Sequence, residues 1–242
     1  MSRSARAIAR SLTTYLAMVG SSMTGRLATI HAMDALRMPA SIAGLPVPQD
    51  EVSDASWRWA HRTLPRYLLA HSVRSYCWGA AIGAWDGLTV DSQVLWCASL
   101  FHDVGLTTIP RNTMCFEIEG AEFARRTLER FGMAADAADR AAIAIILHMQ
   151  PAVTLDDGVE PVLLDRGTAI DVRGVDVDLV ESVRGTVTRK FPRGAFDRHF
   201  VSAIRREVAR RGDCQSARLL HDADLEAAMA RSPWAMDATA PC

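Results

Sequence analysis

Apolar residues recur through most of the chain at helical spacing, and sustained alternation of period two is scarce. The clearest stretch starts after Thr63, with Pro65 suited to a first helical turn, and runs to about Trp85. One face of this predicted helix carries Leu64, Leu68, His71, Ser75 and Trp78. The pattern predicts an all-α fold in the form of a helical bundle.

The next predicted helix leads directly into a polar pair. Asp91 can cap its N-terminus, and the apolar run that follows ends at His102 and Asp103, with Gly105 as the stop. Asp171 is expected at the end of a later helix. A short helix that carries Trp57 is predicted near the start of the domain, with Ser53 and Asp54 as possible caps. Further helices are predicted over residues 117–130, 136–148, 161–170, 176–190 and 195–211.

Prolines and glycines between residues 39 and 50 predict a non-helical connector. We therefore expect an N-terminal extension and Pro/Gly linker over residues 1–50, a helical domain over 51–212 and a C-terminal tail over 213–242. The extension is rich in Arg and Ser, but it lacks a long apolar run and a small-residue cleavage site. It is interpreted as an amphipathic or poorly ordered segment, not as a targeting peptide.

Charge and composition narrow the classes of partner. The chain has 27 basic and 28 acidic residues and a net charge of -1, so no polybasic field is available for nucleic acid. No apolar run reaches the ~20 residues of a transmembrane helix. The expected partner is a small-molecule substrate, without nucleic acid or membrane, and a homo-oligomer is left open.

The cysteines favour a reducing compartment. They are odd in number, widely spaced and never in a C-x-x-C pair: Cys77, Cys97, Cys115, Cys214 and Cys242. This pattern argues for free thiols in the cytoplasm and against a disulfide framework or a structural zinc site.

Several ionisable side chains fall on apolar faces or at helix ends, where burial without compensation is costly. His71, taken alone, is as well explained by a hydrogen-bonded histidine in the core. His102 and Asp103 are adjacent, so their side chains diverge by ~100° on a regular helix unless the chain turns at Gly105. Arg74, three residues after His71, either reaches this region or forms a surface salt bridge.

The order and context of these residues resemble the HD superfamily of metal-dependent hydrolases. The resemblance rests on residues 70–76 (AHSVRSY), residues 99–107 (SLFHDVGLT) and the distal Asp171. Further stretches look like the cyanamide hydratase branch, namely 115–121 (CFEIEGA), 146–148 (ILH), 167–174 (GTAIDVRG) and 191–193 (FPR) with Phe196 and Phe200. The similarity covers roughly residues 54–211 and implies that the domain expected over 51–212 is an HD domain.

The resemblance implies a divalent metal bound by His71, His102, Asp103 and Asp171. Two imidazoles and two carboxylates suit zinc, with iron, manganese or nickel also compatible. Such a metal would ionise a bound water, which Asp103 could orient or deprotonate.

Two further residues are candidates for catalysis. His148 matches a proton donor or substrate ligand, although a histidine at a helix C-terminus can also be a simple cap. Glu117 is either a proton shuttle behind the metal ligands or a first-turn carboxylate favoured by the helix dipole.

The absence of a lysine at position 106 makes a phosphate substrate less favoured. Many phosphodiesterase-like HD proteins carry lysine where this chain has Leu106, although Arg74, Arg111 and Arg173 could compensate. The sequence favours a hydratase or hydrolase that adds metal-bound hydroxide to a small nitrogen compound, with cyanamide going to urea as the reference reaction. The alternatives are an HD-type phosphohydrolase acting on a nucleotide or other phosphate ester, and a non-catalytic metal- or ligand-binding module.

Overall fold

The computed structural model describes residues 37–108 and 114–234 and confirms the all-α prediction. The chain divides into two units after Met38, and its helices and strands over the described residues belong to the second unit, Pro39–Cys242. The longer helices are α2 (Glu51–Thr63), α3 (Arg66–Trp85), α4 (Ser92–Phe101), α5 (Phe116–Arg130), α6 (Ala135–Leu147), α7 (Val159–Arg173), α8 (Glu181–Lys190), α9 (Phe196–Arg210), α10 (Gln215–His221) and α11 (Leu225–Arg231). Short 3-10 turns are η1 (Val104–Leu106), η2 (Leu155–Asp157) and η3 (Val177–Val180).

The connector before α2 forms a small antiparallel hairpin. Strand β1 (Ser41–Ile42) pairs with β2 (Leu45–Pro46), and Ile42 is fully buried. Two positive-φ residues, Ala43 and Gly44, make the turn between the strands. The linker predicted over residues 39–50 is therefore non-helical, as expected.

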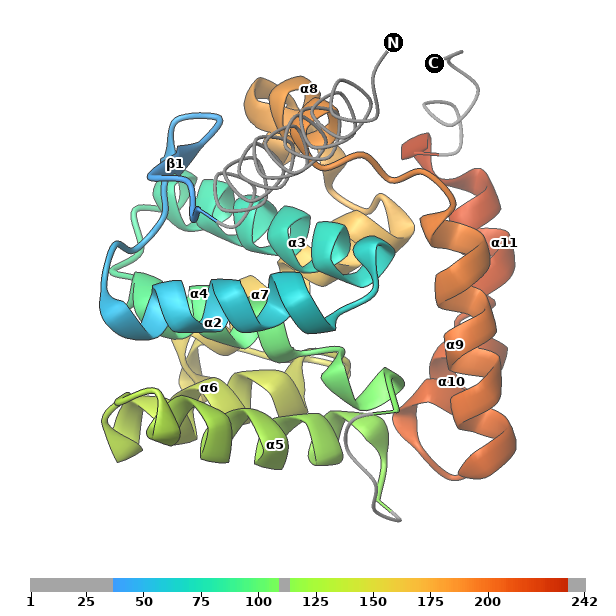
Figure 1. Cartoon of the computed structure of the whole chain (residues 1–242). Coiled ribbons are helices and arrows are strands. Elements are labelled where there is room, and N and C mark those ends of the chain that lie inside the picture. Colours follow the sequence, from blue (N-terminus) through green and yellow to red (C-terminus); the bar gives the residue numbers. More distant parts are fainter. Residues whose placement is uncertain (1–36, 109–113, 235–242) are drawn as a thin grey trace, which may run out of the picture. The chain divides into compact units, whose positions relative to one another are not determined.

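Helices α3 and α7 pack closely, with α4 against both of them (Figure 1). Glycine allows this approach, because a Cβ atom at Gly79 would lie 2.7 Å from the carbonyl oxygen of Leu163. In α7, a Cβ atom at Gly167 would overlap the carbonyl oxygen of Ser75 in α3. The close contact brings residues of α3 and α7 within hydrogen-bonding distance across the core.

The end of α4 differs in detail from the prediction. Asp91 caps the helix as expected, its side chain accepting from the backbone N–H of Val94. The chain then continues into η1, so Gly105 lies within a 3-10 turn and is not the residue that ends the helix. Gly105 is needed for another reason, since a Cβ atom there would overlap the backbone of Phe116 at the start of α5.

The C-terminal helices α9, α10 and α11 contact one another and close one side of the core (Figure 1). An apolar cluster joins them to earlier helices, and its buried members are Leu68, Phe116, Val172, Phe196, Phe200, Ile204, Leu225 and Met229. Leu106, the last residue of η1, packs against this cluster. The predicted tail at 213–242 thus contains two helices, and the domain limits themselves stay a prediction.

The free-thiol prediction is wrong for two cysteines. Cys115, before α5, and Cys214, before α10, form a disulfide that spans 99 residues, with their Cα atoms 5.6 Å apart. Cys77 and Cys97 are free and buried. Sequence spacing could not reveal the pair, because the two positions meet only through the packing of helices distant in sequence.

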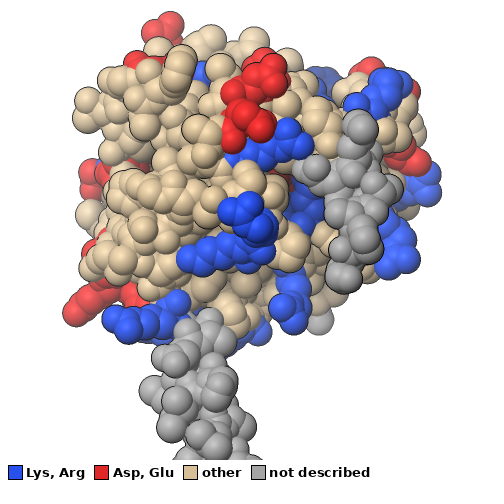
Figure 2. Space-filling view, turned by 90° about the horizontal axis from the view of Figure 1, so that it is seen from above, with Lys and Arg blue, Asp and Glu red and all other residues tan. Residues whose placement is uncertain are grey.

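The face drawn in Figure 2 carries charged side chains of both signs. In the view of Figure 2, basic side chains are separated by uncharged residues and accompanied by acidic ones, over the part of this face that is described. None of the helices within residues 37–108 and 114–234 combines the length and hydropathy that a bilayer crossing requires.

Candidate metal centre

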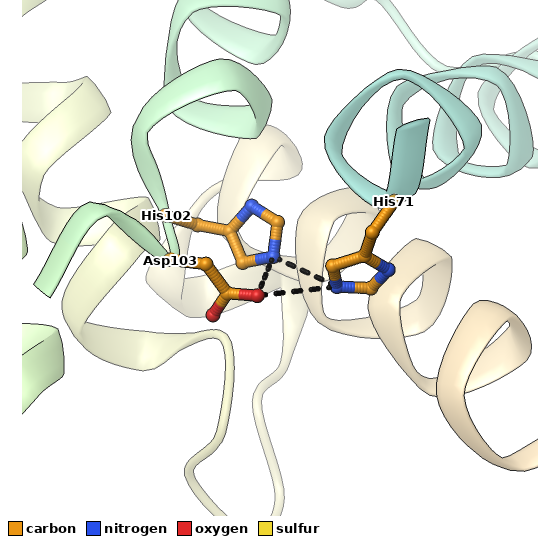
Figure 3. Close-up of side chains that lie close together, drawn as sticks. All are labelled: His71, His102 and Asp103. Atoms are coloured by element: carbon orange, nitrogen blue, oxygen red, sulfur yellow. Dashed lines mark hydrogen bonds and ion pairs between the residues drawn. The ribbon is translucent and has the colours of Figure 1, made fainter. Parts of the chain in front are cut away.

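Three of the predicted ligands converge on one point in the core (Figure 3). His71 comes from the middle of α3, whereas His102 and Asp103 lie where α4 passes into η1. The Nε2 atoms of the two histidines are 3.1 Å apart, and Oδ2 of Asp103 lies 3.4 Å from Nε2 of His71 and 3.3 Å from Nε2 of His102. All three residues are at most 3% exposed. The turn after α4 therefore overcomes the divergence expected for adjacent helical residues.

The outer nitrogen of each imidazole is held by an acceptor. Nδ1 of His71 faces Oδ2 of Asp171 at 2.7 Å, and Nδ1 of His102 faces the carbonyl oxygen of Ser99 at 2.8 Å. Since a carbonyl or carboxylate oxygen can only accept, each Nδ1 carries the proton and donates it. In the neutral tautomers, both Nε2 lone pairs then point at Asp103.

This arrangement has the chemistry of a cation site. Oδ2 of Asp103 is buried and has no hydrogen-bond partner among the described residues. Although burial opposes ionisation, His102 and His71 lower the pKa of Asp103 to about 2, so the carboxylate is charged. Two imidazole lone pairs and a carboxylate oxygen repel one another unless a positive charge lies between them. These residues fit a divalent metal.

Asp171, the fourth predicted ligand, lies against the opposite edge of His71. Its carboxylate accepts from Nδ1 of His71, from Nε and Nη2 of Arg74 at 2.7 Å each, and from Nε1 of Trp78 at 2.9 Å. Although burial disfavours its charge, Arg74 and Arg193 hold the pKa of Asp171 well below its usual range. In this arrangement Asp171 orients His71, and its place among the metal ligands stays a prediction.

Arg74 is fully buried, so the surface salt bridge considered for it is wrong. Beyond Asp171, its Nη1 donates to the carbonyl oxygens of Phe191 and Pro192 at 3.1 and 3.3 Å. A guanidinium held in this way has no free edge to offer a phosphate. Arg111, another compensating cation considered from the sequence, lies outside the described residues.

His148 follows α6 and comes close to the cluster from a third direction. Its ring centroid lies 5.0 Å from that of His102, and its Nε2 is 3.9 Å from Oδ1 of Asp103. Nδ1 donates to the carbonyl oxygen of Ile145, which leaves Nε2 as an acceptor. Burial and the neighbouring His102 lower the pKa of His148 to about 4, so the ring is neutral near pH 7.

Glu117 does not belong to the group formed by His71, His102 and Asp103. It is 3% exposed at the start of α5, and burial, together with the charge of Glu207, raises its pKa against the effect of Arg211. The described residues that line the cavity at the metal centre do not include Glu117. Its role as a proton shuttle stays a prediction that no contact of the described residues supports.

A cavity of about 380 Å³ opens from the cluster. His71, His102, Asp103 and His148 form one part of its wall. The rest comes from the segment after α6, from α7, from Phe200 of α9 and from α10 with the residues behind it. Sequence reasoning missed the α10 residues Gln215, Arg218 and Leu219, whose i, i+3, i+4 spacing marks one helical face.

Comparison with known families agrees with this geometry. Residues 68–229 match the family model described as HD domain, so the chain belongs to the HD domain family. Among curated proteins, it is similar to cyanamide hydratases DDI2 and DDI3 of Saccharomyces cerevisiae. Each is 26% identical over 189 residues, which cover 74% of this chain and 83% of the relative. The predicted resemblance to the cyanamide hydratase branch is thereby confirmed.

Proposed function

We propose that this protein is a metal-dependent hydratase or hydrolase of a small nitrogen-containing molecule, with conversion of cyanamide to urea as the reference reaction. The observation that carries the proposal is the convergence of His71, His102 and Asp103 at the wall of a cavity. The relatives named as cyanamide hydratases support the choice of reaction. The likeness is distant, so the substrate is part of the proposal.

The charges of the cavity also argue against an anionic substrate. Away from the cluster, Arg173 and Arg218 are balanced by Asp165 and Asp222. Phosphoryl transfer depends on a surplus of positive groups around the phosphate oxygens. The engaged guanidinium of Arg74 and this balance disfavour a phosphate ester.

In this proposal the metal is held by Nε2 of His71, Nε2 of His102 and Oδ2 of Asp103, with zinc as the first choice. A zinc ion in such a site acts as a Lewis acid and lowers the pKa of a bound water to ~7. The hydrogen bonds from the two Nδ1 atoms keep both rings turned toward the cluster. Burial of the three ligands excludes bulk water from their contacts.

His148 moves the proton. Addition of water to a nitrile carbon forms a C–O bond and requires transfer of a water proton to the nitrile nitrogen. The neutral Nε2 of His148 accepts that proton and returns it to the nitrogen, while Oδ1 of Asp103, 3.9 Å away, stabilises the transient imidazolium. His148 therefore acts first as a base, and the donor role expected from the sequence follows in the second half of the transfer.

A paired assay tests the proposal. The purified protein, with its metal content measured by elemental analysis, is assayed for urea from cyanamide and for phosphate from a panel of nucleoside phosphates. Urea release that scales with metal content is expected. Phosphate release without urea would replace the proposal by a phosphohydrolase, and bound metal without either product would favour a binding module.

A cytoplasmic location also stays a proposal. The sequence favoured the cytoplasm because all cysteines were expected to be free thiols. Cys115 and Cys214 are bonded to each other, so they do not support that inference. Fractionation of cells that produce the protein, followed by detection in the soluble cytoplasmic fraction, tests it.

A further inference from the structure

The cavity extends far along one face of α7. Asp165, Thr168, Ala169 and Val172 line it, and their i, i+3, i+4, i+7 spacing forms a single stripe. Seven residues at a rise of 1.5 Å correspond to ~10 Å along the helix axis. Asp171, next to Val172, contacts His71, so Asp165 lies at the end of the stripe away from the cluster.

This space is larger than the reference substrate needs. Cyanamide consists of one carbon and two nitrogens with their hydrogens. At ~30 Å³ for a water-sized group, such a molecule needs on the order of 90 Å³. The cavity of about 380 Å³ lies in the range of pockets that enclose larger organic ligands. Most of its volume would remain unused by cyanamide.

The cavity is apolar along part of its wall. Ala169 and Val172 of α7 face it together with Met149, Pro151 and Leu219 from other segments. An alkyl chain placed between them would exchange water for hydrocarbon contacts, which strengthens binding by about fourfold per buried methylene.

The far end offers a carboxylate. Asp165 is partly buried and, among the described residues, makes no side-chain hydrogen bond. Burial raises the pKa of Asp165 to about 6, although the nearby Arg173 and Arg166 oppose the shift. A carboxylate in this condition is stabilised by an N–H donor on a ligand.

We propose that the substrate is elongated: a nitrile-type group reaches His71, His102 and Asp103, an alkyl segment lies along Ala169 and Val172, and an amine at the other end donates to Asp165. The proposal rests on the proposed function, because it assigns a substrate class to the same site. The reaction is unchanged, with water adding across the carbon–nitrogen triple bond to give a substituted urea.

Three compounds test the proposal: cyanamide, pentylcyanamide and aminobutylcyanamide, the last two matched in length. We expect kcat/KM to rise at least tenfold from cyanamide to pentylcyanamide, since several methylenes become buried. A further gain of about tenfold is expected for the amine, from a hydrogen bond to a charged group.

Two variants assign these gains to residues. Asp165→Asn should remove the gain from the amine and keep the gain from the alkyl chain. Ala169→Leu should narrow the apolar part of the cavity and remove the gain from the chain. Asp156→Asn, an exposed carboxylate that does not line the cavity, is the matched control and should keep both gains.

Binding of the products gives a second readout, which does not depend on turnover. Calorimetry with urea, pentylurea and aminobutylurea should show the same order of affinity, with the same response to Asp165→Asn. If cyanamide is hydrated but length and amine bring no gain in either experiment, the elongated substrate is overturned and the proposed function stands. If none of the three cyanamides is hydrated, the proposed function fails, and the elongated substrate fails with it.

Discussion

Asp103 and Asp171 are both buried carboxylates beside His71, yet their surroundings are opposite. Oδ2 of Asp103 faces the Nε2 atoms of His71 and His102, which carry no proton in the neutral tautomers, and it has no hydrogen-bond partner among the described residues. Asp171 is surrounded by donors from His71, Arg74 and Trp78. One edge of His71 therefore lacks positive charge, whereas the other edge has it in excess.

The contrast between Asp103 and Asp171 indicates how a fold can prepare a metal site. The donors around Asp171 keep it charged, and the charged Asp171 fixes the proton of His71 on Nδ1. That proton leaves the Nε2 lone pair free on the side of Asp103. The many hydrogen bonds to Asp171 thus explain why Oδ2 of Asp103 receives none from His71. Substitutions of either carboxylate, or of its neighbours, test this relation.

The largest effect, on metal binding and turnover, is expected when Asp103 and Asp171 are neutralised in two separate variants. Asp103→Asn should abolish turnover and metal binding, because an amide is a poor ligand and cannot balance a divalent charge. Asp171→Asn should weaken metal binding by only ~10–100-fold, as for a residue that orients a ligand. Elemental analysis and metal titration measure both, with Asp156→Asn as a control. Equal losses in the two variants would make Asp171 a direct ligand.

The next effect concerns stability without metal. Arg74→Leu leaves Asp171 charged and buried with fewer donors, which should cost about 3–5 kcal/mol in the free energy of unfolding. Urea denaturation in the presence of a chelator measures this. Arg58→Leu, which breaks the exposed pair with Asp54, should change stability by less than about 1 kcal/mol. Similar costs in the two variants would argue against the donor-rich environment of Asp171.

A smaller effect on turnover is expected at His148. This histidine lies near Asp103 but does not belong to the group formed by His71, His102 and Asp103. His148→Ala should keep the metal and lower kcat by ~100-fold, the lower range for proton-transfer catalysis. His61→Ala, outside the cavity lining, is the control. Loss of metal from the His148 variant would make this histidine a ligand and would change the proposed roles.

The sequence predicted both carboxylates of this comparison, but not the donors around Asp171. His71, His102 and Asp103 were found together because their order along apolar helices resembles the family motif. The pairing of Arg74 with Asp171 was missed, since an arginine on a helix is more often at the surface and nothing in its spacing marks the close contact of α3 with α7. Pairings of this kind depend on which glycines let two helices approach, here Gly79 and Gly167.

The cavity was the other part that the sequence did not reveal. The resemblance ended near residue 211, so Gln215 and Leu219 were assigned to a tail, although α10 contributes them to the cavity wall. The disulfide between Cys115 and Cys214 fixes the start of α10 to the start of α5. Both features depend on contacts between segments distant in sequence, which local periodicity does not record.

The smallest effect is expected on the pH dependence of ligand binding and involves a third carboxylate, the partly buried Asp165. Asp165 has neither the imidazoles of Asp103 nor the donors of Asp171, and burial raises its pKa to about 6 while Arg173 and Arg166 oppose the shift. Arg218 and Asp222 line the same cavity. Asp165 is thus mostly charged at pH 7 and mostly protonated at pH 5.

An amine ligand should therefore bind Asp165 more weakly as the pH falls. Between pH 7 and pH 5 the ionised fraction of a carboxyl with a pKa of about 6 drops about tenfold, which is the largest loss of affinity expected for aminobutylurea. Pentylurea should be much less affected, because a methyl group does not sense the charge. Calorimetry at the two pH values with wild-type protein and Asp165→Asn measures the difference. An equal pH response of both ligands, or a response that survives in the variant, would assign the titration to another group and leave Asp165 outside the binding site.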